Sequence, residues 1–330
     1  MDDLAIVIPA WQAARFLPLS VPAAAAAARG RKIVVVDAGS TDGTARRAIE
    51  LGARLVRLPE RAGPAEARNA GVAAIEAEVI LFLDADCVAH RDVVERVLAA
   101  FRAEPGLAAI TGSYDDDPPE RNFASSYMNL RHAFTHHRAR RERSGFWAGC
   151  GAVRRATFLQ AGGFDARRYP RPMIEDVELG LRLAPLGMLR LDPRIQAKHL
   201  KRWSLVSVIR TDVASRAVPW SELILETGRM PDDLNLRRSQ RAAAALAPFA
   251  LVAMVLLPVA VATATSLLVG IAAGILALAL ALQLDMMAFF RRRRGLAFAV
   301  AAFAFHQVHL VYASAAFAWV ASLRRRRRAP

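Results

Sequence analysis

The chain has 330 residues, of which 54% are apolar and 23% are charged, and it carries 45 Lys and Arg against 30 Asp and Glu. This composition excludes a disordered chain and a collagen-like chain, and the length is typical of one or two domains. The two cysteines are too few for a disulfide scaffold.

The first part of the chain alternates short apolar runs with segments typical of helices. Strands are expected at residues 4–9, 32–36, 54–58 and 79–83, and helices at 12–29, from about 43, and at 64–77. Because these runs are continuously apolar, both faces of the sheet should be covered by helices. The pattern predicts an α/β fold with a largely parallel sheet, in which ligands bind at the carboxyl ends of the strands.

The segment 35–44, VVDAGSTDGT, places a carboxylate at the end of the second expected strand. Ser40, Thr41 and Asp42 are good N-cap residues for the helix that follows. Asp37 lies before the cap, so a nucleotide contact is its functional interpretation. The segment contains no GxGxxG, and a dinucleotide fold of the usual kind is therefore not indicated.

The segment 79–87, VILFLDADC, runs from a buried strand into Asp84 and Asp86. In an extended chain the i, i+2 spacing puts both carboxylates on one side. Two such charges repel each other unless a cation lies between them. Mg²⁺ favours one or two carboxylates together with substrate phosphates, so the segment predicts a divalent-cation site.

Six stretches of the chain together resemble family 2 glycosyltransferases of the GT-A fold. They are IVIPA at 6–10, VVDAGSTDGT at 35–44, AEARNAG at 65–71, LFLDADC at 81–87, GGFD at 162–165 and EDVELGLRL at 175–183. They occur in the order of the family and cover roughly residues 4–203. The resemblance implies a Rossmann-like GT-A domain over residues 1–203, with hexosyltransferase-like activity, a nucleoside-diphosphate sugar as donor and Mg²⁺ or Mn²⁺ as cofactor.

The resemblance also implies the donor site. Pro9 and Asp37 would line the nucleoside pocket, and Arg68 would approach the diphosphate or ribose of the donor. A solvated helix arginine is the alternative for Arg68. Asp84 and Asp86 match the DxD motif, with Asp86 as the direct metal ligand and Asp84 nearer the sugar or ribose.

Two positions of the donor site depart from the family pattern. Ala38 stands where many members have a second carboxylate, so the choice of nucleotide is open. Trp11 and Gln12 stand where an Asn-Glu pair is usual after the first strand.

For the acceptor side, the resemblance implies that Asp176 is the catalytic base of an inverting transfer and that Glu175 or Glu178 orients either this base or the acceptor. The alternative is that these acids simply suit the helix dipole. Three residues before a helix expected near Arg154 would border the acceptor and the donor sugar, with glycines that let a ligand approach the backbone. They are Gly149, Cys150 and Gly151.

Residues 199–203, HLKRW, resemble the Gln-x-x-Arg-Trp motif of cellulose-synthase-like enzymes, with His199 in place of the glutamine. In this reading Arg202 would neutralise the diphosphate leaving group and Trp203 would stack under an acceptor sugar. An interfacial anchor is the alternative for the Arg-Trp pair. Processive synthesis and single addition both remain open.

A junction is expected over residues 204–241. Leu205, Ile209, Val213 and Ala217 recur every four residues and predict an amphipathic helix that ends at Pro219. This helix could lie in a membrane interface or pack on its own domain.

Residues 242–330 are expected to form a membrane region with two to three transmembrane helices. Residues 242–290 fit two spans with a break between 262 and 270, and residues 295–323 form a third apolar run. Arginines at 237–241 and 291–294 on the cytoplasmic side would suit a hairpin. Arginines at 324–328 then make the last run either a crossing against the positive-inside rule or a re-entrant or interfacial segment.

The chain is expected to be a multi-pass protein of the cytoplasmic (inner) membrane, with its catalytic domain in the cytoplasm. No cleavable signal is expected at its acidic start. The expected partners are the sugar donor, a lipid-linked or glycan acceptor of cell-envelope polysaccharide or glycolipid synthesis, and membrane lipids. The alternatives are a polyprenyl-phosphate acceptor and a non-catalytic protein that binds nucleotide sugars. Nucleic acid is not expected as a partner, because the arginine clusters flank apolar spans.

Overall fold

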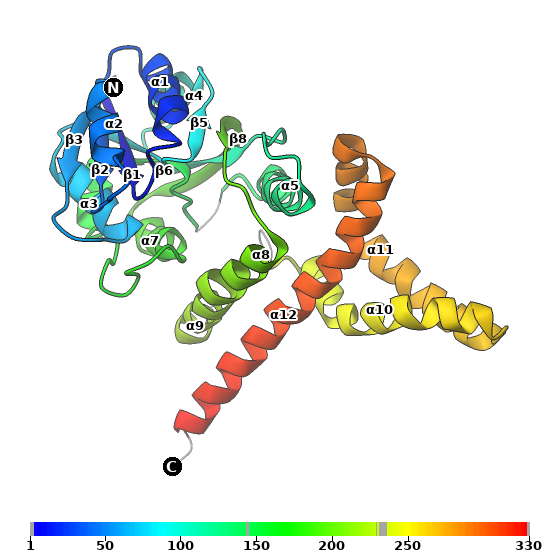
Figure 1. The fold of residues 1–330 in the computed structure, drawn as a ribbon. Coiled ribbons are helices and arrows are strands. Elements are labelled where there is room, and N and C mark those ends of the chain that lie inside the picture. Colours follow the sequence, from blue (N-terminus) through cyan, green and yellow to red (C-terminus); the bar gives the residue numbers. More distant parts are fainter. Residues whose placement is uncertain (1–2, 143–144, 229, 231–235, 329–330) are drawn as a thin grey trace. The chain divides into compact units, whose positions relative to one another are not determined.

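The computed structural model describes residues 3–142, 145–228, 230 and 236–328. The chain divides into two compact units, Met1–Arg202 and Trp203–Pro330 (Figure 1). The first unit is an α/β structure and the second consists of helices. Each unit is described by itself below.

The first unit is built on a mixed sheet of eight strands in the order β3-β2-β1-β4-β7-β6-β8-β5. The strands are β1 (Leu4–Ala10), β2 (Ile33–Asp37), β3 (Arg54–Arg57), β4 (Val79–Leu83), β5 (Cys87–Ala89), β6 (Leu107–Tyr114), β7 (Cys150–Arg154) and β8 (Met188–His199). The first four strands pair in parallel, as predicted. The later half of the sheet is different, because β7 runs antiparallel between β4 and β6, and β5 runs antiparallel to β8. The sheet is therefore mixed rather than largely parallel.

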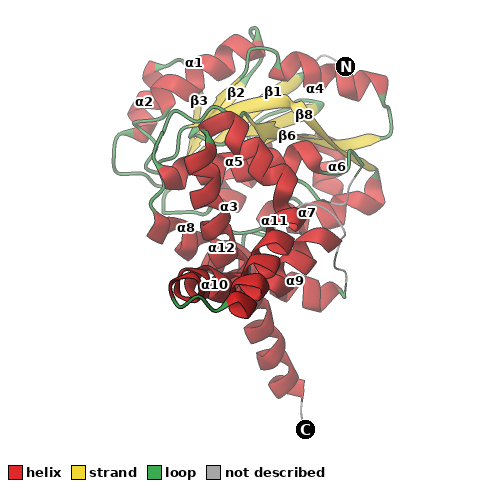
Figure 2. Ribbon diagram, turned by 90° about the vertical axis from the view of Figure 1, so that its right-hand side faces the viewer, coloured by secondary structure: helices red, strands yellow, loops and turns green. Residues whose placement is uncertain are grey.

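Helices cover both faces of this sheet (Figure 2). They are α1 (Leu17–Ala28), α2 (Thr44–Glu50), α3 (Pro64–Ala73), α4 (Val93–Ala103), α5 (Phe123–Arg138), α6 (Arg155–Gln160) and α7 (Glu175–Leu183). Strand β1 shows why its apolar run is continuous. Ile6 and Ile8 pack in the core shared with α1 and α4, whereas Val7 packs in the core shared with α3, α6 and α7. Successive side chains alternate between two buried faces.

Helix α1 begins at Leu17 rather than at Gln12, where we expected it. Residues 12–16 instead form a loop whose backbone is hydrogen-bonded to the loop after β2. The backbone N–H groups of Ala13 and Ala14 donate to Thr44 Oγ1 and Asp42 Oδ2, at 2.8 and 3.0 Å. Gln12 has a positive φ of 49°, which ends any helical continuation toward the N-terminus.

The second unit begins with a continuous helical stretch, α8 (Leu205–Thr211), a π-helix (Asp212–Ala217) and α9 (Val218–Thr227). We expected the first helix to end at Pro219, and this prediction is wrong. Pro219 is the second residue of α9, and the turn before it is a π-helix. Proline lacks an N–H and clashes with the carbonyl of a regular preceding turn, and the wider π turn relieves both constraints.

Three long helices complete the second unit: α10 (Arg238–Ala262), α11 (Ser266–Arg294) and α12 (Leu296–Arg328). All three are long and apolar enough to cross a membrane. The break between α10 and α11 lies at residues 263–265, inside the predicted interval. These helices indicate that the chain associates with a membrane.

Polar side chains connect the helices inside this otherwise apolar unit. Gln307 of α12 donates to Gln283 of α11 at 3.1 Å. Asp212 of the π-helix is 2% exposed and accepts hydrogen bonds from Tyr312 of α12 and from Arg216, both at 2.8 Å. His309 of α12 lies 3.2 Å from the same carboxylate. The helical stretch 205–227 at the start of the second unit is thus tied to the last helix of the chain.

Candidate functional site

Asp37 lies at the carboxyl end of β2, where the fold predicts a ligand, and its side chain is fully buried. Its Oδ1 accepts a hydrogen bond from the Ser40 N–H at 3.1 Å. Its Oδ2 has no hydrogen-bond partner among the described residues and lies 3.6 Å from Nε of Arg57. Pro9 is partly buried on the neighbouring strand β1. Asp37 therefore places a buried carboxylate oxygen near the Arg57 guanidinium at the carboxyl end of β2.

The loops after β1 and β2 are joined by their polar side chains. Gln12 Nε2 donates to Thr41 Oγ1 at 3.0 Å, and the Gln12 N–H donates to Ser40 Oγ at 3.0 Å. Ser40 and Thr41 therefore hold two loops together. The prediction that they cap α2 is wrong. Asp42 does accept from the Thr44 N–H at the start of that helix, at 3.1 Å.

Arg68 connects the two acidic motifs of the sequence. It is 4% exposed on α3, and it forms ion pairs with Asp84 at 2.7 Å and with Glu175 at 2.9 Å. The alternative of a solvated arginine is therefore wrong. Its Nε has no hydrogen-bond partner in the part of the chain that the structure describes. Because one buried guanidinium bonds to both carboxylates, it holds the end of β4 and the start of α7 together.

Asp84 and Asp86 do not lie in an extended segment. The prediction that their spacing puts both carboxylates on one side of the chain is therefore wrong. Strand β4 ends at Leu83, and a turn with a Cys87 N–H to Asp84 O hydrogen bond leads into β5. Asp84 pairs with Arg68, whereas Asp86 lies 3.5 Å from Nε2 of His199. The turn thus gives the two carboxylates different partners.

Asp86 and His199 form the pair best suited to a divalent cation. His199 ends β8 opposite Cys87 of β5, and its ring stacks on Tyr114 with centroids 4.3 Å apart. Burial alone would raise the pKa of Asp86, but the charge and hydrogen bond of His199 hold it below its usual range. The described residues contain no group of three or more His, Cys, Asp or Glu side chains placed to hold a metal. One or two protein ligands do fit a cation that is otherwise held by substrate phosphates.

Asp176 lies in the first turn of α7 and is only partly exposed. Its Oδ2 accepts a hydrogen bond from the Ala148 N–H at 3.1 Å. Burial and then the adjacent charge of Glu175 raise the pKa of Asp176 to about 7, against the lowering effect of Arg68 and of two backbone N–H groups. A carboxylate that titrates near neutrality is suited to accept a proton.

Gly180 allows α7 to reach the segment that carries Ala148. A Cβ atom at Gly180 would lie 2.4 Å from the backbone N of Phe146, so no side chain fits there. Since Gly180 lies one turn after Asp176, this close packing fixes the position of the Asp176 carboxylate against Ala148.

Cys150 and Gly151 begin strand β7, Gly149 lies in the turn before it, and helix α6 starts only at Arg155. A Cβ at Gly149 would lie 2.4 Å from the Trp147 ring, and one at Gly151 would lie 2.2 Å from the Trp147 carbonyl oxygen. Packing within the chain therefore already accounts for both glycines. The thiol between them is fully buried, and burial raises the pKa of Cys150 to about 12.

The Arg-Trp pair spans the boundary between the two units. The side chain of Arg202 is 74% exposed and lies 3.9 Å from Glu120. Trp203 is only 6% exposed and belongs to the second unit. Stacking of an acceptor sugar on Trp203 remains a prediction, and it would require a ring face that is more open than the one seen here.

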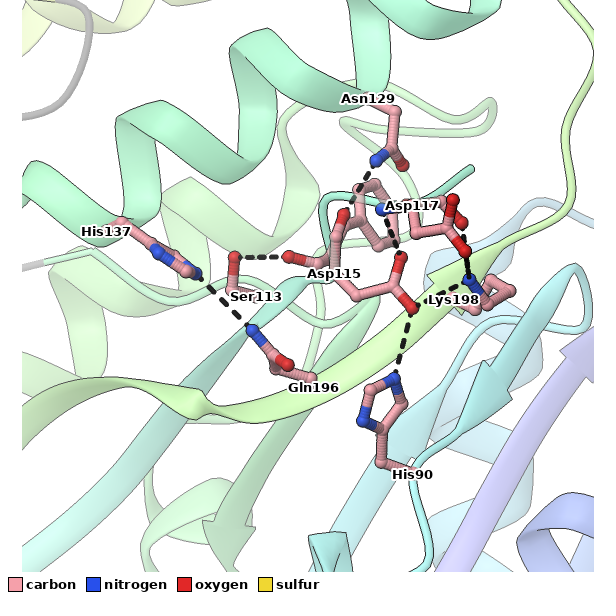
Figure 3. A network of polar contacts seen from close by, with 9 residues as sticks. His90, Ser113, Asp115, Asp117, Asn129, His137, Gln196 and Lys198 are labelled. Atoms are coloured by element: carbon pink, nitrogen blue, oxygen red, sulfur yellow. Dashed lines mark hydrogen bonds and ion pairs between the residues drawn. The ribbon is translucent and has the colours of Figure 1, made fainter. Parts of the chain in front are cut away.

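A polar network around Asp115 was not found from the sequence (Figure 3). Asp115 follows β6, is 7% exposed, and lies 3.1 Å from His90 and 3.2 Å from Lys198. Asn129 of α5 donates to the Asp115 carbonyl at 2.6 Å. Because Lys198 precedes His199 on β8, the network fixes the end of the strand that carries His199. Asp115 follows the sequence ITGSY rather than a continuous apolar run, so the signal that marked Asp37 and Asp84 was absent here.

Comparison with known proteins gives the class of this chain. Residues 5–162 match the model of glycosyl transferase family 2. The mannosyltransferase PcManGT from Pyrobaculum calidifontis, solved with GDP-Man and Mn²⁺, is similar with a TM-score of 0.64 and 20% identity, over 96% of this chain and 87% of that one. S. aureus TarS 1–349, solved with UDP-GlcNAc, gives a TM-score of 0.50 and 14% identity, over 67% and 64% of the two chains. None of the curated protein sequences compared with the chain matches it.

At these identities the two structures establish the fold, which is GT-A. The chain is thus a glycosyltransferase with three apolar helices at its C-terminal end. Residues 5–162 match the model of glycosyl transferase family 2, and this range contains four of the six sequence motifs.

Proposed function

We propose that the chain is a membrane-bound, inverting glycosyltransferase that moves a sugar from a nucleoside diphosphate to a hydroxyl of a lipid or glycan acceptor. The observation that carries this proposal is the arrangement around Arg68. One buried guanidinium pairs with Asp84 of the donor motif and with Glu175, the neighbour of Asp176. A donor at Asp84 would therefore lie close to a carboxylate that is available as a base.

The donor side is supported by the residues at the carboxyl ends of β2 and β4. Asp37 would accept from the nucleobase, and Asp86 with His199 would hold Mg²⁺ or Mn²⁺. PcManGT was solved with GDP-Man and Mn²⁺, and TarS with UDP-GlcNAc, which supports a nucleotide sugar as the donor here. A divalent cation, when bound, stabilises the negative charge that develops on the departing diphosphate.

The acceptor side depends on Asp176. Its carboxylate takes the proton of the acceptor hydroxyl while the hydroxyl oxygen bonds to the anomeric carbon of the sugar. The bond from that carbon to the diphosphate oxygen breaks on the opposite side, so the configuration inverts. The Ala148 N–H, at 3.1 Å, orients the carboxylate for this step. Such a base contributes about 10²–10⁴-fold to the rate.

The membrane region supports an acceptor that is lipid-linked or reached at a membrane surface. The spans α10, α11 and α12 are flanked by arginines at 237–241, 291–294 and 324–328. With the positive-inside rule, the first two clusters favour a cytoplasmic catalytic unit on the inner membrane. The product would then be a glycolipid or polysaccharide of the cell envelope.

The test compares the full-length protein in detergent with its Asp176→Asn variant. Nucleotide sugars are supplied with Mg²⁺ or Mn²⁺ together with a membrane lipid extract, and released nucleoside diphosphate and donor affinity are measured. We expect Asp176→Asn to reduce turnover by at least about 100-fold with donor affinity retained. Near-normal turnover in this variant would show that Asp176 is not the base and would favour a polyprenyl-phosphate acceptor, which needs none.

A control variant separates this loss from general damage to the domain. Glu95→Gln removes an acid that pairs with Arg29 on the surface, where both side chains are more than half exposed. It should keep the turnover of the unmodified protein. Nucleotide-sugar binding without any turnover in the unmodified protein, across the donor and acceptor panel, would instead indicate a non-catalytic binding protein.

A further inference from the structure

Tyr114 is a buried side chain that lies between the two acidic parts of the candidate site. It is the last residue of β6, it is 9% exposed, and it lies outside the six sequence motifs. Its ring contacts the rings of His199 and Trp147, which belong to two different segments of the chain. The first segment carries the partner of Asp86, and the second carries the backbone group that binds Asp176.

On the side of the cation pair, Tyr114 fixes the plane of the His199 ring. The two rings are stacked, with centroids 4.3 Å apart and an interplanar angle of 7°. Tyr114 pairs in register with Ala197 of β8, and His199 projects from the same face of that strand two positions later. Because Ala197 carries only a methyl group, the phenol ring can lie past it and over the imidazole. The plane of the imidazole determines where its Nε2 lies, which is 3.5 Å from Asp86.

On the side of the base, Tyr114 packs against Trp147. The two ring planes are nearly perpendicular, at 88°, and their centroids are 4.8 Å apart. The Trp147 N–H donates to Thr111 Oγ1 of β6 at 3.1 Å, so the backbone here is held by the same strand. The next residue is Ala148, whose N–H donates to Asp176 at 3.1 Å. A displaced Trp147 would therefore move the backbone donor that orients the Asp176 carboxylate.

The surroundings of Trp147 leave its ring little freedom as long as Tyr114 is in place. A Cβ at Gly149 would lie 2.4 Å from the Trp147 ring, so this ring lies directly against the backbone. His132 of α5 contacts both aromatic side chains, with centroids 4.7 Å from Tyr114 and 4.9 Å from Trp147. Loss of the phenol ring would open a gap into which its neighbours could turn, since a close-packed interior keeps side chains in place only while it is filled.

We propose that Tyr114 is a positioning residue of the transfer reaction, which holds the cation pair through His199 and the base through Trp147. The inference rests on the proposed function and extends it to a residue that acts only through its neighbours. The attacking hydroxyl and the anomeric carbon must be brought to within about 3–3.5 Å of each other, and small displacements are costly. A rigid ring that packs against both sides of the site keeps the distance between the cation and the base constant.

The experiment measures two quantities for the full-length protein in detergent. The affinity for Mn²⁺, with UDP or GDP present, is obtained from the electron paramagnetic resonance signal of free Mn²⁺. The pH dependence of kcat/KM for sugar transfer is obtained at saturating Mn²⁺. The variants are Tyr114→Met, Tyr114→Phe and Trp147→Met, because methionine fills space without supplying a ring.

Tyr114→Met should change both quantities. Mn²⁺ binding should weaken by about tenfold or more, since loss of a group that orients a metal ligand has an effect of this size. The midpoint of the pH profile should rise by at least about 0.5 pH unit, because a carboxylate that loses an N–H donor holds its proton more tightly. The charged neighbours of Asp176, which are Glu175 and Arg68, are the same in every variant and do not contribute to this difference.

The other variants separate the two sides of the site. Trp147→Met should raise the pH midpoint and leave Mn²⁺ affinity unchanged, since His199 keeps its stacked partner. Tyr114→Phe retains the ring and should behave like the unmodified protein in both measurements. Phe101→Met, on α4, is the matched control, because it removes a fully buried ring from the same core and should change neither quantity.

The outcomes distinguish this inference from the proposed function. If Tyr114→Met keeps the Mn²⁺ affinity and the pH midpoint of the unmodified protein, Tyr114 only fills space and the inference is wrong, while the proposed function stands. If only one quantity changes, the role of Tyr114 on the other side is wrong. A loss in Tyr114→Phe as large as that in Tyr114→Met would overturn the role of ring packing, whatever the stability of the methionine variant. If the unmodified protein neither binds Mn²⁺ with these nucleotides nor transfers sugar, the proposed function itself fails.

Discussion

The ionisation of Asp176 sets the pH at which the proposed base can work. Burial and the charge of Glu175 raise its pKa to about 7. The carboxylate is therefore largely protonated at pH 6 and largely ionised at pH 8. We expect kcat/KM to rise with pH through about 7 and to level off above it, measured from pH 5.5 to 9 at saturating metal. A flat profile across this range would argue that proton transfer to Asp176 does not limit the reaction.

The raised pKa of Asp176 also predicts that removing the charge of this carboxylate changes the stability of the protein. The folded-state pKa lies above the ordinary aspartate value, so the stability contributed by this group is present below pH 4 and is lost as the pH rises toward 7. At pH 8 the folded protein must hold an ionised, poorly solvated carboxylate. Asp176→Asn should therefore increase the free energy of unfolding by on the order of 2 kcal/mol at pH 8. The gain should vanish near pH 4, and thermal unfolding at both pH values measures the difference.

At the scale of elements, the fit of α7 against the segment before β7 decides where Asp176 lies. A Cβ at Gly180 would meet the Phe146 backbone at 2.4 Å, and the backbone cannot give way as a flexible side chain would. Gly180→Ala should displace α7, lower kcat/KM by at least about tenfold and cost about 1–3 kcal/mol of stability. Gly106→Ala is the matched control, because nothing lies within 4 Å of its added Cβ. Equal activity in the two variants would contradict this account of α7.

Much of the first unit could be predicted from its sequence because its signals are local. Strands β1, β2 and β4 are apolar runs bounded by turns, and Asp37 and Asp84 lie directly after two of these runs. The pairing of Arg68 could not be predicted, since its partner Glu175 is 107 positions away. Likewise, Gly149 and Gly151 suggested an approaching ligand, whereas the ring and carbonyl of Trp147 take that space. Contacts between distant segments, rather than periodicity, determine these features.

At the scale of the whole molecule, the arginine clusters predict the orientation of the membrane region. If residues 291–294 face the cytoplasm, Arg292→Cys should react with a membrane-impermeant maleimide in inside-out vesicles and not in intact cells. Thr263→Cys, in the connection between α10 and α11, should show the opposite pattern. Background labelling should be low, because Cys87 and Cys150 are both buried. Labelling of both variants from one side would mean that the hairpin does not span the bilayer.

The buried carboxylate of Asp212, in the π-helix, depends on side chains of α12 for its hydrogen bonds. Its partners Tyr312 and His309 come from α12, about a hundred positions further along. A protein shortened after α11 would keep this acid in apolar surroundings while removing the hydroxyl and the imidazole that solvate it. Arg216 would remain as a partner, but the loss of two hydrogen-bonding groups from a buried carboxylate is costly, so the π-helix at Asp212 would be expected to rearrange. Shortening of the membrane region from its C-terminus would then disturb the helices that directly follow the catalytic unit. In a series of progressive deletions, the stability of the protein should drop abruptly between residues 328 and 309 rather than gradually.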